Sequence, residues 1–501
     1  MNNFPRRDRF STFTRSTFTN RMVFPRRANA PLYPAVSEVP HSTLKDVPKH
    51  FEAIVIGVGA MGSSACYHLA QRGKRVLGLE QFSIPNDQGS SHGMTRIIRL
   101  AYSEHPSYVN LLRRAYELWH DLENVVNEKL LYTTGGIDAG PEDSWVFQGS
   151  WLSCKQHDLP HQVLTGAELH RKFPGYNLPS NIMAVFQPDA GFLTPERCVA
   201  SYAIAAQSLG AEIHGHEPVL GWEPRGDGFR VVTTHDEYHG DKLIISAGAW
   251  AANMIPELRG LTVPERQILA WLQPSRPEYF QLHNFPVFQM LVEEGRYYGF
   301  PQFGIPGFKF ARYHHFEEII DPDDFEREAN EDDESVLREF CERYFPYGVG
   351  PTQTLKSCIF TNTPDRHFIL DIHPELPNLI IVSPCSGHGF KFVSVIGEIA
   401  ADLAIYGTTR HDISLFQLAR FSDPLYMASL SSRHRAGNAG RPRLDSTRSF
   451  IRGYPTPQGT RWQTTQQPPW SAWRNFPSTT VSQAQMSEWG YQIPEDVPTF
   501  W

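Results

Sequence analysis

The stretch FEAIVIGVGAMGSSACYHLAQRGKRVLGLE, residues 51–80, decides the fold of this chain. An apolar run at 53–56 predicts a buried strand, and residues 63–71 follow with a helical pattern. A turn and a second apolar run at 76–79 predict another strand. This order is typical of a βαβ unit in an α/β fold.

Three glycines and one acid give this unit its chemistry. Gly57 allows a tight turn, Gly59 lets the backbone approach a pyrophosphate, and Gly62 lets the helix pack on the strand. The helix N-terminus offers free N–H groups to the phosphates. Glu80 can accept hydrogen bonds from a ribose 2′-hydroxyl and would repel a 2′-phosphate. The motif therefore predicts NAD or FAD rather than NADP.

Composition narrows the class of protein. The chain has 501 residues and a net charge of −8, which argues against nucleic acid or an anionic membrane as partner. It has no apolar run long enough to span a bilayer. Its six cysteines show no C-x-x-C pair and no zinc-ligand spacing, so we expect no metal and a reducing compartment. We predict an intracellular, cytoplasmic protein; a peroxisomal location stays open, although Thr499-Phe500-Trp501 does not match S-K-L.

Two kinds of sequence pattern alternate along the chain. Segments 51–132, 192–262 and 362–421 have α/β patterns, whereas 133–191 and 263–361 are rich in aromatics, proline and alternating residues. We predict a Rossmann-like domain built from the first set, with an inserted antiparallel-sheet substrate domain built from the second.

The two ends differ from this body. Residues 1–50 are rich in arginine and lack an apolar core, which predicts a disordered arm, with a transit peptide as the alternative. Residues 422–501 lose apolar periodicity and predict a disordered tail.

The segment GSSHGMTRIIR, residues 89–99, reads as a loop that enters a helix. Arg96 and Arg99 are three residues apart and would share one face of that helix. Two arginines on one face can hold a carboxylate by forked hydrogen bonds. The alternative is an ordinary solvated basic face.

The segment SGHGFKF, residues 386–392, follows an apolar strand at 379–383 and precedes an amphipathic helix at 393–405. Such a loop, here Gly387-His388-Gly389, can hold a cofactor ring with backbone N–H groups. Lys391 stands at a helix start, where the dipole disfavours a cation, and this suggests an anionic partner. The alternative is a turn with a surface lysine. Another strand, in 242–250, ends at Gly248, where we also expect the cofactor to bind.

Two further residues stay ambiguous when read alone. Cys358 lies in an apolar run, where a cysteine is usually a small buried hydrophobe. Lys309, in GFKF at 307–310, has the pattern of an exposed lysine on a strand.

Together, these motifs resemble the monomeric sarcosine oxidase family of FAD-dependent amine oxidases, which includes N-methyltryptophan oxidase and pipecolate oxidases. The resemblance covers about residues 51–421. It implies FAD as cofactor, a small amino-acid substrate and O2 as partners, and a monomer. It also implies oxidation of the C–N bond of a secondary amino acid to an imine, with release of hydrogen peroxide. The motifs that carry it are GVGAMG with Glu80, GSSHGMTRIIR, DAGFLTPER, YYGFPQFG, GFKF, CIFTNTPD, SGHGFKF and HDISLF.

The resemblance implies roles for individual residues. Cys358 matches the cysteine that binds FAD covalently through the flavin 8α-methyl group. Arg99 and Lys391 match the pair that holds the substrate carboxylate. Lys309 matches the lysine beside flavin N5 that promotes reaction with oxygen.

Four more matches surround the expected flavin ring. His92 and Arg96 match residues packed near the flavin, and Tyr298 and His314 match residues that line the substrate cavity.

The chain also departs from the family pattern. Phe360 stands where relatives have tyrosine, and Ser383-Pro384-Cys385 replaces a Gly-rich run. One extra residue lies between Lys309 and the Tyr313-His314 pair. These changes leave the substrate open. One alternative is an oxidase of a larger N-alkylated amino acid in a biosynthetic pathway, whose imine is trapped by cyclisation. Another is a fructosyl-amino-acid oxidase. More distant alternatives are an NAD-dependent dehydrogenase and a non-catalytic scaffold.

Overall fold

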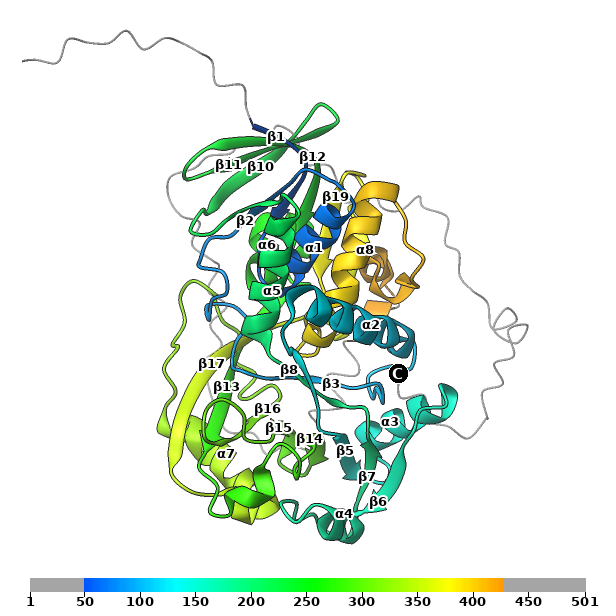
Figure 1. Ribbon diagram of the computed structural model, residues 1–501, viewed down its shortest axis with the longest axis vertical. Coiled ribbons are helices and arrows are strands. Elements are labelled where there is room, and N and C mark those ends of the chain that lie inside the picture. Colours follow the sequence, from blue (N-terminus) through cyan, green and yellow to red (C-terminus); the bar gives the residue numbers. More distant parts are fainter. Residues whose placement is uncertain (1–48, 425, 428–429, 431–501) are drawn as a thin grey trace, which may run out of the picture. The chain divides into compact units, whose positions relative to one another are not determined.

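The βαβ unit that the sequence predicts is present in the computed structural model, which describes residues 49–424, 426–427 and 430 (Figure 1). Strand β1 (Lys49–Ile56) leads into helix α1 (Ala60–Gln71), which returns through a turn to β2 (Val76–Leu79). The prediction is confirmed. The arm at 1–50 and the tail at 422–501 lie almost wholly outside the described residues.

Five parallel strands form the centre of the first sheet, in the order β19-β12-β1-β2-β9. Antiparallel strands extend it beyond β12 and β19. The strands added to β1 and β2 are β9 (Glu212–His214), β10 (Val219–Arg225), β11 (Gly228–Thr233), β12 (Glu237–Ile245), β18 (Ile369–Ile372) and β19 (Leu379–Ser383).

Helices α1, α5 (Pro195–Ser208) and α8 (Val393–Tyr406) pack together beside this sheet, and α2 (Tyr108–Val126) packs on α5 and α8 (Figure 1). Helix α8 is buried along most of its length and ends at Gly407, in the left-handed conformation. A Cβ on Gly397 would meet Ser64 Oγ at 2.1 Å, so only glycine lets α1 and α8 approach this closely.

The second sheet has the order β17-β13-β16-β15-β14-β5-β7-β6. The sequence predicts antiparallel strands here, and every pair is antiparallel except β14 with β5. That one parallel pair joins two segments about 150 residues apart in the chain, which a local pattern does not reveal. The strands are β5 (Gly136–Pro141), β6 (Gln162–Thr165), β7 (Ile182–Gln187), β13 (Val263–Leu272), β14 (Val287–Val292), β15 (Gly295–Phe300), β16 (Phe308–Arg312) and β17 (Thr352–Asn362).

Alternation along these strands separates a structural face from a site face. Phe308, Phe310 and Tyr297 belong to an apolar cluster that α7 (Glu331–Tyr344) completes. Their sequence neighbours Lys309 and Tyr298 point to the opposite face. The same register aligns Asp138, Gln289, Tyr298, Lys309 and Cys358 on that opposite face.

A third, small sheet corrects one prediction. Arg96–Ile98 forms strand β3, not a helix, and pairs with β8 (Gly191–Leu193), which also pairs with β4 (Leu131–Thr133). β-Branched Thr95, Ile97 and Ile98 favour the strand. Arg96 and Arg99 therefore do not share a helix face.

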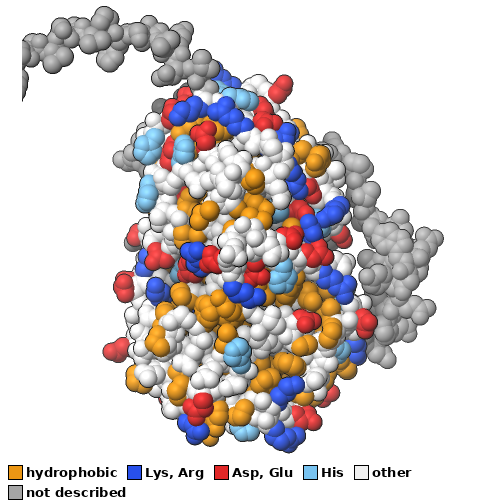
Figure 2. All heavy atoms as spheres, in the orientation of Figure 1, with side chains coloured by type: hydrophobic (Ala, Val, Ile, Leu, Met, Phe, Trp, Pro, Cys, Tyr) orange, Lys and Arg blue, Asp and Glu red, His pale blue; other side chains and the backbone are white. Residues whose placement is uncertain are grey.

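Of the remaining helices, α3 (Trp145–Gln156) and α4 (Gly166–Lys172) lie between strands of the second sheet, and α6 (Ala251–Met254) lies between β12 and β13 in the chain. Among the described residues, no helix is both long and apolar enough to cross a bilayer, and no group of side chains has the make-up of a metal site. On the face shown in Figure 2, acidic and basic side chains are interspersed.

Candidate active site

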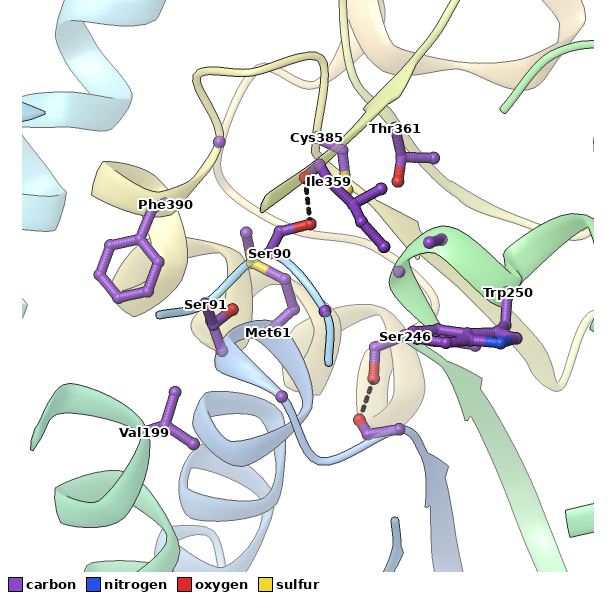
Figure 3. A pocket seen from close by; sticks show the side chains of 18 of the residues that line it. Met61, Ser90, Ser91, Val199, Ser246, Trp250, Ile359, Thr361, Cys385 and Phe390 are labelled. Carbon is purple, nitrogen blue, oxygen red and sulfur yellow. Dashed lines mark hydrogen bonds between the residues drawn. The ribbon is translucent and has the colours of Figure 1, made fainter. Parts of the chain in front are cut away.

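A cavity of about 350 Å³ opens where the parallel strands of the first sheet end. In open α/β sheets, ligands bind at the carboxyl ends of the strands. Here β1, β2, β12 and β19 deliver Gly57, Glu80, Ser246 and Pro384 to the cavity wall. Figure 3 shows Met61 at the start of α1, Trp250 beyond β12, and Ile359 and Thr361 on β17 around the same space.

The glycine motif forms one end of this cavity. A Cβ on Gly57 would meet Ser246 O at 2.7 Å, and one on Gly62 would meet Gly57 O at 1.9 Å, so packing requires both glycines. A Cβ on Gly59 or Gly248 would meet no protein atom within 4 Å. Both line the cavity, so their lack of a side chain leaves space for a ligand rather than for the protein.

Glu80 closes the same end. Its carboxylate accepts hydrogen bonds from the backbone N–H groups of Val58 (2.9 Å) and Phe82 (3.1 Å). Burial raises its pKa, and these backbone donors oppose the change. The side chain is thus fixed at the tip of β2, as the dinucleotide motif predicts.

The loop between β19 and α8 forms the other end. Gly387 has φ +76°, and a Cβ there would meet the Phe360 ring at 2.7 Å. A Cβ on Gly389 would meet Pro384 O at 1.6 Å. His388 is buried between Tyr102 Oη (2.5 Å to Nδ1) and a backbone carbonyl, and burial lowers its pKa to about 3. The histidine therefore holds the loop as a neutral ring.

Cys358 is buried on β17 beside two basic side chains. Arg96 donates from its guanidinium to Cys358 Sγ at 3.4 Å. Burial alone would raise the pKa of the Cys358 thiol, but His92 and Arg96 oppose this and bring it to about 7. A thiol of this pKa is half ionised at neutral pH, which distinguishes a reactive cysteine from a structural one.

Lys309 is buried, not exposed as its local pattern suggested. Its Nζ lies 2.6 Å from Gly93 O, 2.9 Å from Thr95 O and 3.0 Å from Thr95 Oγ1. Burial lowers the pKa of Lys309, and Arg96 lowers it further, while the three oxygen acceptors favour the ammonium form. These three oxygen partners fix the Lys309 amino group close enough to Arg96 and Cys358 for their charges to act on it.

Arg99 lies in a buried ionic cluster. Its guanidinium contacts Glu104 at 2.9 Å and Asp138 at 3.3 Å. Burial would lower the pKa of Arg99, but the two acids raise it. Burial raises the pKa of Asp138 to about 6. Glu104 also binds Arg296 at 2.6 Å, and these arginines hold its pKa well below its usual range despite burial.

Lys391 lines the cavity near this cluster. Its Nζ donates to His388 O at 2.7 Å, and burial together with Arg99 lowers its pKa. Lys391 is the middle residue of a short 3-10 turn, Phe390–Phe392, that precedes α8. Of the two predicted carboxylate-binding cations, Lys391 faces the cavity, whereas Arg99 is enclosed by its acidic partners.

Of the two residues predicted to line the substrate cavity, Tyr298 and His314, only the first does so. His314 has φ +54° and turns its ring to Glu265, at 3.0 Å. Its neighbour Tyr313 lines the cavity in its place. The extra residue after Lys309 accounts for this, because a shift of one residue turns a side chain to the other face of a strand.

Sequence reasoning missed the residues that surround Arg99. Asp138 and Gln289 occupy paired positions on β5 and β14. Each is a polar residue in an otherwise apolar run, GGIDAG and VFQMLV, and such an interruption is the signal that could have found it. Glu104 and Arg296 carry no comparable local signal.

The residues at this cavity fit FAD. The Thr361 hydroxyl lines the cavity and is buried with no hydrogen-bond partner among the residues that the structure describes. Buried polar groups are normally satisfied, so this atom indicates a missing polar ligand. His92 lies beside Cys358 and lowers the pKa of its thiol. The open space at Gly59 agrees with a dinucleotide at that end of the cavity.

Comparison with known proteins identifies relatives over most of the chain. Residues 52–403 match the family of FAD dependent oxidoreductases (DAO). Monomeric sarcosine oxidase from Bacillus sp. (strain B-0618) is 40% identical over 377 residues, 74% of this chain and 96% of that protein. N-methyl-L-tryptophan oxidase from Yersinia pestis (strain Pestoides F) is 35% identical over 375 residues, 74% of this chain and 99% of that protein.

Two solved structures share the fold. NikD, an unusual amino acid oxidase essential for nikkomycin biosynthesis, gives a TM-score of 0.65 at 22% identity and covers 74% of this chain and 97% of that one. L-Proline dehydrogenase from P. horikoshii gives 0.65 at 20% identity, over 75% and 99%.

Proposed function

This chain belongs to the FAD dependent oxidoreductase family, and on that premise we propose that it oxidises the C–N bond of an N-methyl amino acid to an imine, with O2 reduced to hydrogen peroxide. It is an FAD-dependent amine oxidase. The observation that carries the proposal is one cavity that joins a dinucleotide-binding end, an ionisable cysteine beside two basic residues, and Lys391, with the buried Lys309 close to that cysteine. An NAD-dependent dehydrogenase needs neither Cys358 nor Lys309.

When bound, FAD would accept two electrons from the substrate and pass them to oxygen. Gly57, Gly59 and Gly62 with Glu80 would hold its dinucleotide part, and Gly387–Gly389 would hold the ring. The remaining chemistry falls to the protein, which binds and orients the substrate and excludes water.

Lys391, which faces the cavity, would orient the substrate through its carboxylate, with Arg99 behind it in the ionic cluster. Both are buried, so their attraction for a carboxylate is screened less than at the surface. Fixing the acid group places the carbon attached to nitrogen, and such positioning supplies much of a rate enhancement. The amine must lose its proton, because its lone pair assists C–H cleavage. Tyr298, Phe300 and Phe360 form an apolar wall that keeps this step dry.

We propose that Cys358 attaches FAD covalently. The low pKa of its thiol supplies the thiolate, which is the nucleophilic form. Cys358 Sγ would hold FAD by a thioether to the flavin methyl carbon, and O2 would be the oxidant for its formation, taking up two electrons and two protons as hydrogen peroxide.

Lys309 would assist the reaction with oxygen. A buried cation stabilises negative charge that develops on oxygen during its reduction. Its three acceptors hold Nζ in place, so little reorganisation is needed at that moment.

The names of the relatives given above refer to sarcosine and N-methyl-L-tryptophan, so N-methyl amino acids are the favoured substrates. The two alternatives, a larger N-alkylated amino acid whose imine cyclises and a fructosyl amino acid, are not favoured. We also propose that the two predicted sets of segments act as a FAD domain and a substrate domain, and that the chain is a monomer. Its cytoplasmic location stays a prediction.

A peroxide-release screen tests the function. Sarcosine, N-methyl aromatic amino acids, pipecolate, proline and fructosyl-glycine would be supplied to the full chain loaded with FAD. We expect release with at least one N-methyl amino acid. Release with fructosyl-glycine alone, or with none of the set, would contradict the proposal.

A further inference from the structure

Tyr313 occupies a position in the cavity wall that the sequence did not assign to it. It follows strand β16 and continues the alternation of Lys309 and Ala311, so it shares their face of the sheet. Its backbone N–H bonds to Arg296 O at 2.8 Å, which fixes this position. The ring is 8% exposed and lines the cavity.

The Tyr313 ring is held from several sides. Arg296 stacks on it, with Cζ 3.9 Å from the ring centroid, and the Trp145 ring lies 4.7 Å from the same Cζ. Tyr298 packs against it at 4.9 Å and Phe360 at 5.7 Å between centroids. A ring fixed in this way loses little entropy when its hydroxyl binds a ligand.

Arg296 is itself fixed. It binds Glu104 at 2.6 Å and also donates to Gln289. The stack therefore runs without a gap from Trp145, 41% exposed, through Arg296 to the cavity.

The Tyr313 hydroxyl lies at the charged end of the cavity. The charges of Arg296, Glu104, Arg99 and Asp138 all act on it, whereas its side chain makes no hydrogen bond to another described residue. A phenol that lines a cavity without a protein partner is available to a ligand.

Arg99, by contrast, is engaged. Glu104, Asp138, Gln289 and Ser103 surround its guanidinium. A carboxylate that enters the cavity thus meets Lys391 and Tyr313 first, with Arg99 behind them.

We infer that Tyr313 is a substrate-binding residue, whose hydroxyl donates a hydrogen bond to the carboxylate of the amino-acid substrate alongside Lys391. This rests on the proposed function and deepens it. Arg296 is the positioning residue that holds the ring.

Ligand binding to the FAD-loaded chain tests this inference. Methoxyacetate has the shape of sarcosine but carries an ether oxygen in place of the amine, so it cannot be oxidised as an amine. Methoxyacetamide has the same shape without the charge. Isothermal titration calorimetry would measure both dissociation constants for the wild type and for Tyr313→Phe. Tyr297→Phe is the matched control, because that ring lies on the opposite face, stacked on Phe340 at 3.7 Å.

We expect Tyr313→Phe to weaken methoxyacetate binding by about tenfold to a hundredfold, the range for a lost hydrogen bond to a charged group. Methoxyacetamide binding should change little, and Tyr297→Phe should match the wild type. Equal methoxyacetate affinity in Tyr313→Phe and the wild type would overturn this inference but leave the proposed function standing. Equal loss for both ligands, or a lowered FAD content or melting temperature, would mean that Tyr313 is structural. Lack of methoxyacetate binding to the wild type would overturn both the inference and the carboxylate site of the proposed function.

Discussion

Replacing Arg96 with Met tests how the protein activates Cys358. The pKa of this thiol is about 7, against 9 for an ordinary thiol, although burial opposes ionisation. Arg96 is one of the two main causes of the decrease, with a guanidinium 3.4 Å from Sγ. Without its charge, the pKa should rise by about two units or more, because burial remains.

The size of the effect follows from two opposing changes. At pH 7 the thiolate fraction falls from about one half to about 1%, a loss of about 50-fold. A thiolate of higher pKa is a better nucleophile, by about eightfold for two units. Covalent attachment should therefore slow only about sixfold at pH 7, while the midpoint of its pH dependence moves from about 7 to about 9 or above.

The assay adds FAD to apoprotein at a series of pH values, stops the reaction with acid, and measures flavin that stays with the denatured chain. Arg96→Lys keeps a positive charge and should keep most of the wild-type profile. Cys385 also lines the cavity, but burial raises the pKa of its thiol to about 11, so Cys385→Ala should leave attachment intact. A wild-type rate that does not vary between about pH 5.5 and 9, or a flavin found on Cys385, would refute this reasoning.

Three further predictions test the rest of the site. Lys309→Met should slow reoxidation of the reduced enzyme by about a hundredfold and its reduction by substrate much less, as stopped-flow absorbance would show; equal effects would contradict the assigned role. Burial raises the pKa of Asp138 to about 6, so this residue takes up a proton as the pH falls through 6. Because a negative charge is then lost from the cluster, carboxylate ligands should bind about tenfold more tightly below that pH. Asp138→Asn should bind them tightly at every pH. If carboxylate binding had the same pH dependence in the wild type and in Asp138→Asn, the proposed effect of the Asp138 charge on binding would be contradicted. Gly62→Ala places a Cβ 1.9 Å from Gly57 O and should cost about 1–3 kcal/mol of stability, measured by thermal unfolding. Gly59→Ala should keep the stability of the protein but lower its affinity for FAD. A destabilised Gly59→Ala variant beside a fully stable Gly62→Ala variant would contradict the packing described.

The sequence was sufficient where structure is local. The strand–helix–strand unit at 51–80 and the strand–loop–helix at 379–405 follow from apolar periodicity and glycine spacing, and both are present with closely similar bounds. Gly57 and Gly62 are needed for the reason that the motif suggests, since a side chain on either would strike backbone.

The sequence failed where distant segments decide the outcome. Arg96 lies on a strand because β8, almost a hundred residues away, pairs with it. Arg99 looked like a free cation, but Asp138 and Glu104 reach it from β5 and a neighbouring loop. Lys309 looked exposed because nothing local shows that the Gly93–Thr95 backbone covers it. Each error concerns contacts formed only by tertiary packing, which a single-sequence pattern does not contain.

The most direct measurement is anaerobic. The purified chain should show the visible absorption of oxidised flavin, and addition of an N-methyl amino acid without oxygen should bleach it. Readmitting oxygen should restore the colour and release one hydrogen peroxide for each flavin. A colourless chain that FAD does not colour, or a flavin band that no N-methyl amino acid bleaches, would contradict the account.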